Sequence, residues 1–330
     1  MQVDHLSFNS ITALRYFNMS IDSVLANNNP SFEQLDVEWN KDEGTVWCYL
    51  NPQPRPCFNP QLLSEVIGLK DRLEDLGVTS SVLLERPHFA VFASRTPGIF
   101  NLGGDLGLFR QMIDAKDRQG LEAYAMACID ASYNVSIGYD LPITTISLIQ
   151  GTALGGGMEG ALAANIIVAE RGVQMGLPEV LFNLFPGMGA YSFLSRRLGA
   201  NEAERVILSG KTWQTEELHE LGLIDILAEA GQGESAVREY IAERQRRSPN
   251  AVMAMQRVRK AVNPVSYQEL EEIALIWVDA ALRLKERDLR ILDRLVRSQN
   301  RVCTQLDRPP MATQTPPLRL SFAKPGLAVH

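Results

Sequence analysis

The sequence of 330 residues contains only four cysteines: Cys48, Cys57, Cys128 and Cys303. They lie too far apart for the CxxC spacing of a metal site, and four are too few for a disulfide-stabilised fold of this length. We therefore expect a reduced, cytoplasmic protein that needs neither a metal nor a cofactor.

Positive charge and long apolar runs are also scarce. The net charge is −7, so the chain lacks the excess of Lys and Arg with which proteins bind nucleic acids non-specifically. The longest stretch without a charge, residues 141–158, is interrupted by Pro142, three threonines and four glycines. The first ten residues, MQVDHLSFNS, do not combine a basic region with an apolar run. We expect neither a membrane span nor a signal peptide.

Apolar residues make up 45% of the chain, enough for a large core. Residues 35–51 alternate around a DEG turn and predict a hairpin, and residues 62–73 then change to helical spacing. A long helix is expected from residue 118 and a β-rich run at 142–151, whereas residues beyond 235 are almost wholly helical in pattern. This alternation predicts a mixed α/β domain with a substantial sheet.

The same pattern divides the chain into four parts. We expect an N-terminal extension at residues 1–35, a core at 36–235 and a C-terminal helical segment at 236–302. Residues 303–330 contain five prolines and predict a flexible tail.

Three consecutive glycines, Gly155–Gly157, follow the strand-like run and stand just before Glu159. A strand that passes through glycines into a helix leaves unpaired N–H groups at the positive end of the helix dipole. Such donors suit a developing oxyanion, and Glu159 can then act as a base or acid beside the same carbonyl. Alternatively, the glycines only permit close packing and Glu159 caps the helix.

A dinucleotide site is a further interpretation of this segment. Gly155 to Gly160 satisfy G-x-G-x-x-G after a strand, and Glu179 follows about 20 residues later. Glu159, however, would place a carboxylate in the loop that must approach a pyrophosphate, and Glu179 does not end a strand of its own. The spacing therefore favours an oxyanion site over a nucleotide site.

A second junction of the same kind lies in SRTPGIFNLGGDLGLF, residues 94–109, with Gly103, Gly104 and Asp105. Two such junctions can hold one carbonyl oxygen between two N–H groups. Asp105 is expected to begin the following helix rather than to act as a catalyst.

Four segments, GTALGGGMEGALA, MGLPEV, FPGMGAYSFLSRRLG and LSGKTWQTEELHELGLID, resemble the crotonase (enoyl-CoA hydratase/isomerase) superfamily, and the resemblance extends from about residue 40 to 300. It implies a spiral of ββα units with a C-terminal helical segment, assembled as a homotrimer or hexamer. It also implies an acyl thioester carbonyl held by the amides of Gly104 and Gly156, with Gly103 as an alternative to Gly104. Glu159 and Glu179 match the paired glutamates of the hydratase branch.

Within the superfamily, RPCFNPQLL, TPGIFNLGGDL, GLPEVLFNLFPGMGAYSF and IWVDAALRL resemble bacterial diffusible signal factor synthases more than ordinary enoyl-CoA hydratases. This resemblance implies dehydration of a medium or long 3-hydroxyacyl chain on acyl carrier protein to a cis-2-enoyl thioester, followed by hydrolysis to the free fatty acid. A signalling regulator is a possible protein partner. The alternatives are an enoyl-CoA hydratase/isomerase and a catalytically silent acyl-binding regulatory protein.

The resemblance and the apolar pattern also suggest contact residues. Leu154, Gly155, Met188 and Trp277 are the candidates for an acyl pocket, with ordinary core packing as the alternative for Met188 and Trp277. Residues 244–260 contain six basic and no acidic side chains, which suits an acidic carrier protein or a CoA phosphate as well as a solvated helix face. The helical apolar face at residues 270–284 is a candidate oligomer contact.

Overall fold

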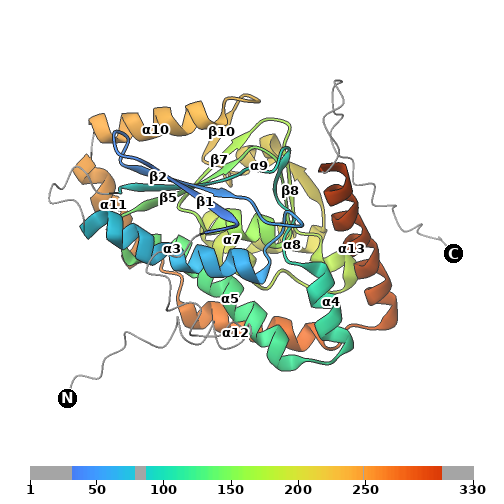
Figure 1. Ribbon diagram of the computed structural model, residues 1–330. Coiled ribbons are helices and arrows are strands. Elements are labelled where there is room, and N and C mark those ends of the chain that lie inside the picture. Colours follow the sequence, from blue (N-terminus) through green and yellow to red (C-terminus); the bar gives the residue numbers. More distant parts are fainter. Residues whose placement is uncertain (1–31, 79–86, 248, 307–330) are drawn as a thin grey trace, which may run out of the picture.

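The computed structural model describes residues 32–78, 87–247 and 249–306 (Figure 1). The expected N-terminal extension and Pro-rich tail therefore lie, except for a few residues each, outside the described residues. No helix within these three ranges is long and apolar enough to cross a membrane.

A six-stranded sheet forms the centre of the fold, in the order β1-β2-β3-β5-β7-β10. The first two strands are antiparallel, with Leu35 opposite Leu50, and confirm the predicted hairpin. The remaining neighbours are all parallel. The strands are β1 (Leu35–Asn40), β2 (Thr45–Leu50), β3 (Phe89–Ser94), β5 (Thr144–Ile149), β7 (Ile166–Glu170) and β10 (Ile226–Ala228).

A smaller sheet of four short strands has the order β4-β6-β8-β9, and its first three strands are parallel neighbours. Its strands are β4 (Ile99–Asn101), β6 (Thr152–Leu154), β8 (Gln174–Gly176) and β9 (Thr212–Gln214). The chain passes three times from a strand of the large sheet to a strand of the small sheet and then into a helical element. These units are β3-β4-α4 (α4, Leu106–Asp114), β5-β6-α6 (α6, Gly156–Ala163) and β7-β8-η3 (η3, Glu179–Phe182). The predicted spiral of ββα units is confirmed.

Helices surround the sheets and make up all the described elements after residue 232, as predicted for the C-terminal part. In Figure 1, α3 and α5 lie on one side of the large sheet and α10 on the other. The remaining helices are α3 (Pro60–Val78), α5 (Arg118–Ser136), η2 (Gly138–Asp140), α7 (Ala190–Leu198), α8 (Ala200–Ser209), α9 (Thr215–Glu220), α10 (Gly233–Arg247), α11 (Pro249–Val262), α12 (Tyr267–Ala281) and α13 (Glu286–Leu306).

Alternation along the strands separates two cores. Because successive side chains of a strand point to opposite faces, Trp47 and Tyr49 pack towards Val237 of α10, whereas Cys48 and Leu50 join the larger core that contains α3 and α5. The cavity described below is lined by residues of this larger core.

Helix α12 belongs to the larger core as well. Leu270 and Trp277 are buried, and the Trp277 ring stacks on Phe109 with 5.0 Å between ring centroids. At the helix start, the Tyr267 hydroxyl donates to Asp130 of α5. The apolar face suggested as an oligomer contact is therefore largely covered by the chain itself, because α12 packs on α5.

Candidate active site

The three parallel strands of the small sheet place the predicted site residues side by side. Gly104 follows the end of β4, Gly156 follows β6, and Glu179 follows β8. Since β4, β6 and β8 are parallel neighbours, their carboxyl ends share one edge of the sheet. Glu159 lies on the first turn of α6 at the same edge.

A mostly apolar cavity of about 110 Å³ lies at this edge. Gly104, Gly156, Glu159 and Glu179 all line it, and so do Met188 and Trp277. Leu154 and Gly155 are not among its lining residues. An apolar part of the lining comes from β2, β3, α3 and α5: Leu50, Leu63, Val66, Phe92, Ala131 and Val135.

The backbone of residues 102–105 leaves a single donor unused. Seven of its eight N–H and C=O groups are hydrogen-bonded within the described chain, and the exception is the N–H of Gly104. The N–H of Leu102 donates to Pro56 O, that of Gly103 to Asn101 Oδ1 and that of Asp105 to Tyr124 Oη. The carbonyls of Leu102 and Gly104 both accept from Gln299 Nε2, that of Gly103 accepts from Phe58 N, and that of Asp105 accepts from Phe109 N. Because its own N–H is already bonded at 2.7 Å, Gly103 cannot substitute for Gly104 as the donor.

Planar peptide groups fix the directions of both candidate donors. The carbonyl of Gly103 accepts from Phe58 N at 2.7 Å, so the N–H of Gly104, on the opposite side of the same trans peptide, points the other way. The carbonyl of Gly155 likewise accepts from Glu159 N, which directs the N–H of Gly156 out of the start of α6. A β-carbon added to Gly156 would lie 3.3 Å from the Gly104 nitrogen, so the two junctions approach each other closely.

Glu159 is held by backbone donors inside the protein. Its side chain is almost fully buried, and Oε1 accepts from the N–H groups of Met188 at 2.8 Å and Ala190 at 3.1 Å. Burial raises the pKa of Glu159, and these two hydrogen bonds partly offset the rise because they favour the ionised form.

Glu179 has less support than Glu159. Its Oε2 is buried and has no hydrogen-bond partner in the described part of the chain. Burial raises the pKa of Glu179, and the charge of Glu159 raises it further. A β-carbon at Gly155 would lie 2.7 Å from Glu179 Oε1, and the φ of +54° at this position favours glycine in any case. A buried carboxyl oxygen without a partner is costly for folding and is typical of functional sites.

The other glycines of this segment serve packing. A β-carbon at Gly157 would lie 2.1 Å from Asn101 O, and one at Gly160 would lie 2.9 Å from the Phe58 ring. The packing interpretation thus applies to these two positions, but Glu159 does not cap its helix, because α6 has no side-chain cap. Within the described ranges, no group of three His, Cys, Asp or Glu side chains is arranged to bind a metal.

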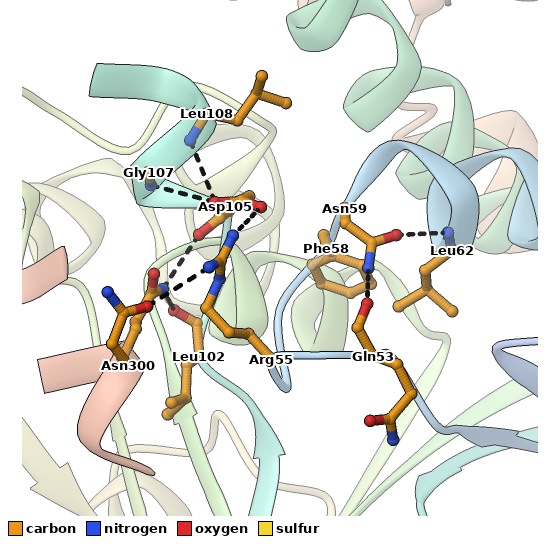
Figure 2. Close-up of polar contacts among 12 residues, drawn as sticks. Gln53, Arg55, Phe58, Asn59, Leu62, Leu102, Asp105, Gly107, Leu108 and Asn300 are labelled. Carbon is orange, nitrogen blue, oxygen red and sulfur yellow. Dashed lines mark hydrogen bonds and ion pairs between the residues drawn. The ribbon is translucent and has the colours of Figure 1, made fainter. Parts of the chain in front are cut away.

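Asp105 caps a helix, as predicted. Its Oδ1 accepts from the N–H groups of Gly107 and Leu108, both at 3.1 Å, and so begins α4 (Figure 2). Arg55 pairs with Asp105 Oδ2 at 2.6 Å and also donates to Asn300 of α13 at 3.4 Å. These contacts stabilise the loop that presents Gly104.

Sequence reasoning did not find the polar face of α5. Tyr124, Cys128 and Ser132, spaced by four residues, all line the cavity. The Tyr124 hydroxyl donates to Phe58 O at 2.7 Å and accepts from Asp105 N at 3.1 Å. The i, i+4 spacing of polar residues in an apolar helix was the available signal.

Comparison with known protein families shows to which family this chain belongs. The model of the enoyl-CoA hydratase/isomerase family matches residues 85–275. The chain belongs to the enoyl-CoA hydratase/isomerase family. The resemblance to the crotonase superfamily is confirmed.

Two relatives each match at least half of this chain. It is 27% identical over 256 residues to the probable mitochondrial enoyl-CoA hydratase 2 of Arabidopsis thaliana, a match that spans 76% of this chain and 79% of that protein. It is also 32% identical over 176 residues to human mitochondrial methylglutaconyl-CoA hydratase, covering 52% of this chain and 49% of that protein.

Solved structures show the same fold. The structure of Pseudomonas aeruginosa DspI superposes with a TM-score of 0.59 at 26% identity, covering 76% of this chain and 97% of DspI. Enoyl-CoA hydratase from Bacillus halodurans superposes with a TM-score of 0.67 at 19% identity, covering 80% and 99% of the two chains. The second likeness is one of fold alone.

Proposed function

We propose that the protein dehydrates a 3-hydroxyacyl thioester to a cis-2-enoyl thioester and then hydrolyses it to the free fatty acid, as a diffusible signal factor synthase. The observation that carries the proposal is the meeting, in one apolar cavity, of the buried Glu159 carboxyl group, the Glu179 carboxyl group with its buried Oε2, and two backbone N–H groups for which the described chain offers no acceptor.

The dehydration step needs each of these groups. The N–H groups of Gly104 and Gly156 bind the thioester oxygen and stabilise the enolate that forms when C2 loses its proton. One of Glu159 and Glu179, ionised, takes that proton, and the other, protonated, gives its proton to the hydroxyl leaving C3 as water. Two neighbouring carboxyl groups with raised pKa values suit this division, because one can stay protonated while the other is charged.

Hydrolysis can use the same groups. A carboxylate removes a proton from a water molecule while the oxygen of that water bonds to the thioester carbon. The same two N–H groups then hold the resulting oxyanion. Collapse of this intermediate breaks the carbon–sulfur bond, and the thiolate of the carrier leaves with a proton from the carboxyl group.

The apolar wall of the cavity supports a fatty acyl substrate. Leu50, Val66, Phe92 and Val135 line the cavity and belong to the larger core, where a hydrocarbon chain loses contact with water. The choice of a synthase over a hydratase is supported by the four sequence segments given above and by the likeness to DspI over nearly the whole of that chain.

The thioester carrier is proposed to be acyl carrier protein, with CoA as the alternative. Arg246 and Arg257, from the basic run at the end of α10 and in α11, are exposed and available to an anionic partner. Charged surface residues of this kind accelerate association with an acidic protein.

An enoyl-CoA hydratase is the second candidate, favoured by the names of the relatives. Purified protein should be given 3-hydroxyacyl-acyl carrier protein and trans-2-enoyl-CoA in parallel, with products identified by mass spectrometry. Release of a cis-2-enoic acid from the first substrate supports the synthase. Hydration of the second without free acid supports the hydratase, and turnover of neither supports a silent acyl-binding protein. Expression alone in a non-producing bacterium, followed by lipid mass spectrometry, tests the same choice in cells.

A further inference from the structure

Helix α13 contacts two of the elements that carry the site, although it lies far from them in sequence. Near its start, Asp288 Oδ2 accepts from Asn183 Nδ2 at 3.2 Å, at the end of the helical turn η3 that begins with Glu179. Further along, Asp293 pairs with Arg110 of α4 at 3.0 Å. Figure 1 shows α13 beside α4 along one side of the molecule.

Gln299 is the residue of α13 that reaches the glycine loop. The side chain is only 6% exposed, and its Nε2 donates to the carbonyls of Leu102 and Gly104, both at 3.1 Å. Two carbonyl acceptors at one nitrogen also fix the orientation of the amide, because an oxygen there would be repelled. A buried amide is costly unless hydrogen-bonded, so these contacts hold Gln299 in place.

The loop needs such an anchor because its central peptide joins two glycines. One hydrogen bond, from Phe58 N to Gly103 O, holds the Gly103–Gly104 peptide itself; without β-carbons the two residues allow the peptide to tilt about that bond, which would turn the N–H of Gly104 away from the cavity. Gln299 holds the carbonyl on each side of that peptide. We propose that Gln299 is a positioning residue, which keeps the N–H of Gly104 directed at the thioester oxygen. The inference rests on the proposed function, in which this N–H binds that oxygen.

Contacts beside Gln299 strengthen the anchor. The next residue, Asn300, accepts from Arg55, and Arg55 holds the Asp105 carboxylate that caps α4 (Figure 2). Both side chains thus connect α13 to residues 102–105. Loss of Gln299 alone leaves the Arg55–Asp105 pair and the hydrogen bond from Phe58 N to Gly103 O intact, so the loop stays in place while its central peptide, then held by Phe58 alone, can tilt.

The test separates positioning from simple packing of α13. Gln299→Leu and Gln299→Met remove the donor and place an apolar side chain of similar size at this position. Asp293→Asn is the matched control, because it weakens the contact of α13 with α4 without touching the glycine loop. Each protein is bound to an enoyl thioester labelled with carbon-13 at the carbonyl, and the vibrational band of that carbonyl is recorded. Thermal melts, kcat and KM are measured in parallel.

We expect the wild type and Asp293→Asn to lower the carbonyl frequency on binding, since hydrogen bonds polarise the carbonyl. Both Gln299 variants should lose most of this shift, with kcat reduced about 10- to 100-fold and KM within about two-fold of the wild type, because the lost interaction acts mainly in the transition state.

A wild-type shift and kcat in either folded Gln299 variant would overturn the positioning role. An equal loss of shift in Asp293→Asn would also overturn it, since helix docking would then be the cause. If the wild type itself gives no shift, the thioester function fails, and the inference fails with it.

Discussion

Glu159 and Glu179 face one cavity from two neighbouring ββα units, and the charge of Glu159 raises the pKa of Glu179. Two backbone N–H groups hold Glu159, whereas Glu179 Oε2 has no partner within the described chain. Ionised Glu159 is therefore favoured over ionised Glu179, and the pair retains a proton to higher pH than an exposed glutamate does.

Replacing either carboxyl group by an amide should remove activity without unfolding the protein. Glu159→Gln keeps an oxygen that can accept from Met188 and Ala190, and Glu179→Gln keeps the volume of the side chain. Each removes one proton-transfer group, so turnover should fall by about 100- to 10,000-fold. Circular dichroism checks the fold, and turnover like that of the wild type would exclude the replaced residue from proton transfer.

The stability of the wild type should depend on pH through the same pair. The pKa of Glu179 is raised in the folded protein, so folding binds a proton, and the stabilisation is complete below the unfolded pKa of about 4.3. It is lost as the pH rises from there through the raised pKa. Glutamine at position 179 does not titrate, so Glu179→Gln does not lose this stabilisation. The melting temperature of Glu179→Gln minus that of the wild type should therefore increase as the pH is raised from acidic to alkaline. A constant difference across that range would show that Glu179 is not buried as a carboxylate.

The apolar lining of the cavity that comes from α3 should limit the length of the acyl chain. Val66→Phe adds a ring on α3 where the cavity has space, so turnover of long chains should fall at least tenfold while that of short chains is retained. Ile67→Phe, on the same helix but outside the cavity lining, is the control. Turnover is measured over a series of thioesters of increasing length. A uniform loss over the series in Val66→Phe would indicate damage to the fold instead.

The two junctions that meet at the candidate site could be recognised in the sequence because they are encoded locally. A strand, two glycines and a helix recur at Gly103–Gly104 and Gly155–Gly156, and each junction must leave N–H groups unpaired. The choice between Gly103 and Gly104 could not be made from sequence, because it depends on a hydrogen bond to the Asn101 side chain.

Long-range contacts were beyond the reach of sequence patterns. Gln299 lies 195 residues from Gly104 along the chain, and in an amphipathic helix it is indistinguishable from a solvated glutamine. Leu154 satisfied the same apolar pattern as Met188, yet only Met188 lines the cavity. Burial depends on which elements pack together, and periodicity does not specify that.

Gly156→Ala tests whether the two glycine junctions form one oxyanion site. The new methyl group would lie 3.3 Å from Gly104 N and 3.4 Å from Gly103 Cα, and both neighbours are backbone atoms with little freedom to move. Alanine keeps the N–H of residue 156 but pushes the two donors apart. A lost oxyanion contact costs on the order of 2.7 to 4 kcal/mol, so kcat should fall by about 100- to 1,000-fold.

The control must be a helical glycine with space around it. Gly160→Ala is unsuitable, because its methyl group would lie 2.9 Å from the Phe58 ring, which itself lines the cavity. Gly68→Ala in α3 is suitable, since the nearest atom to its methyl group would be 4.0 Å away. There alanine should stabilise the helix by up to about 1 kcal/mol and leave kcat unchanged. Kinetics and thermal melts are measured on both variants. Full activity in Gly156→Ala with an unchanged melting temperature would mean that the thioester oxygen binds elsewhere.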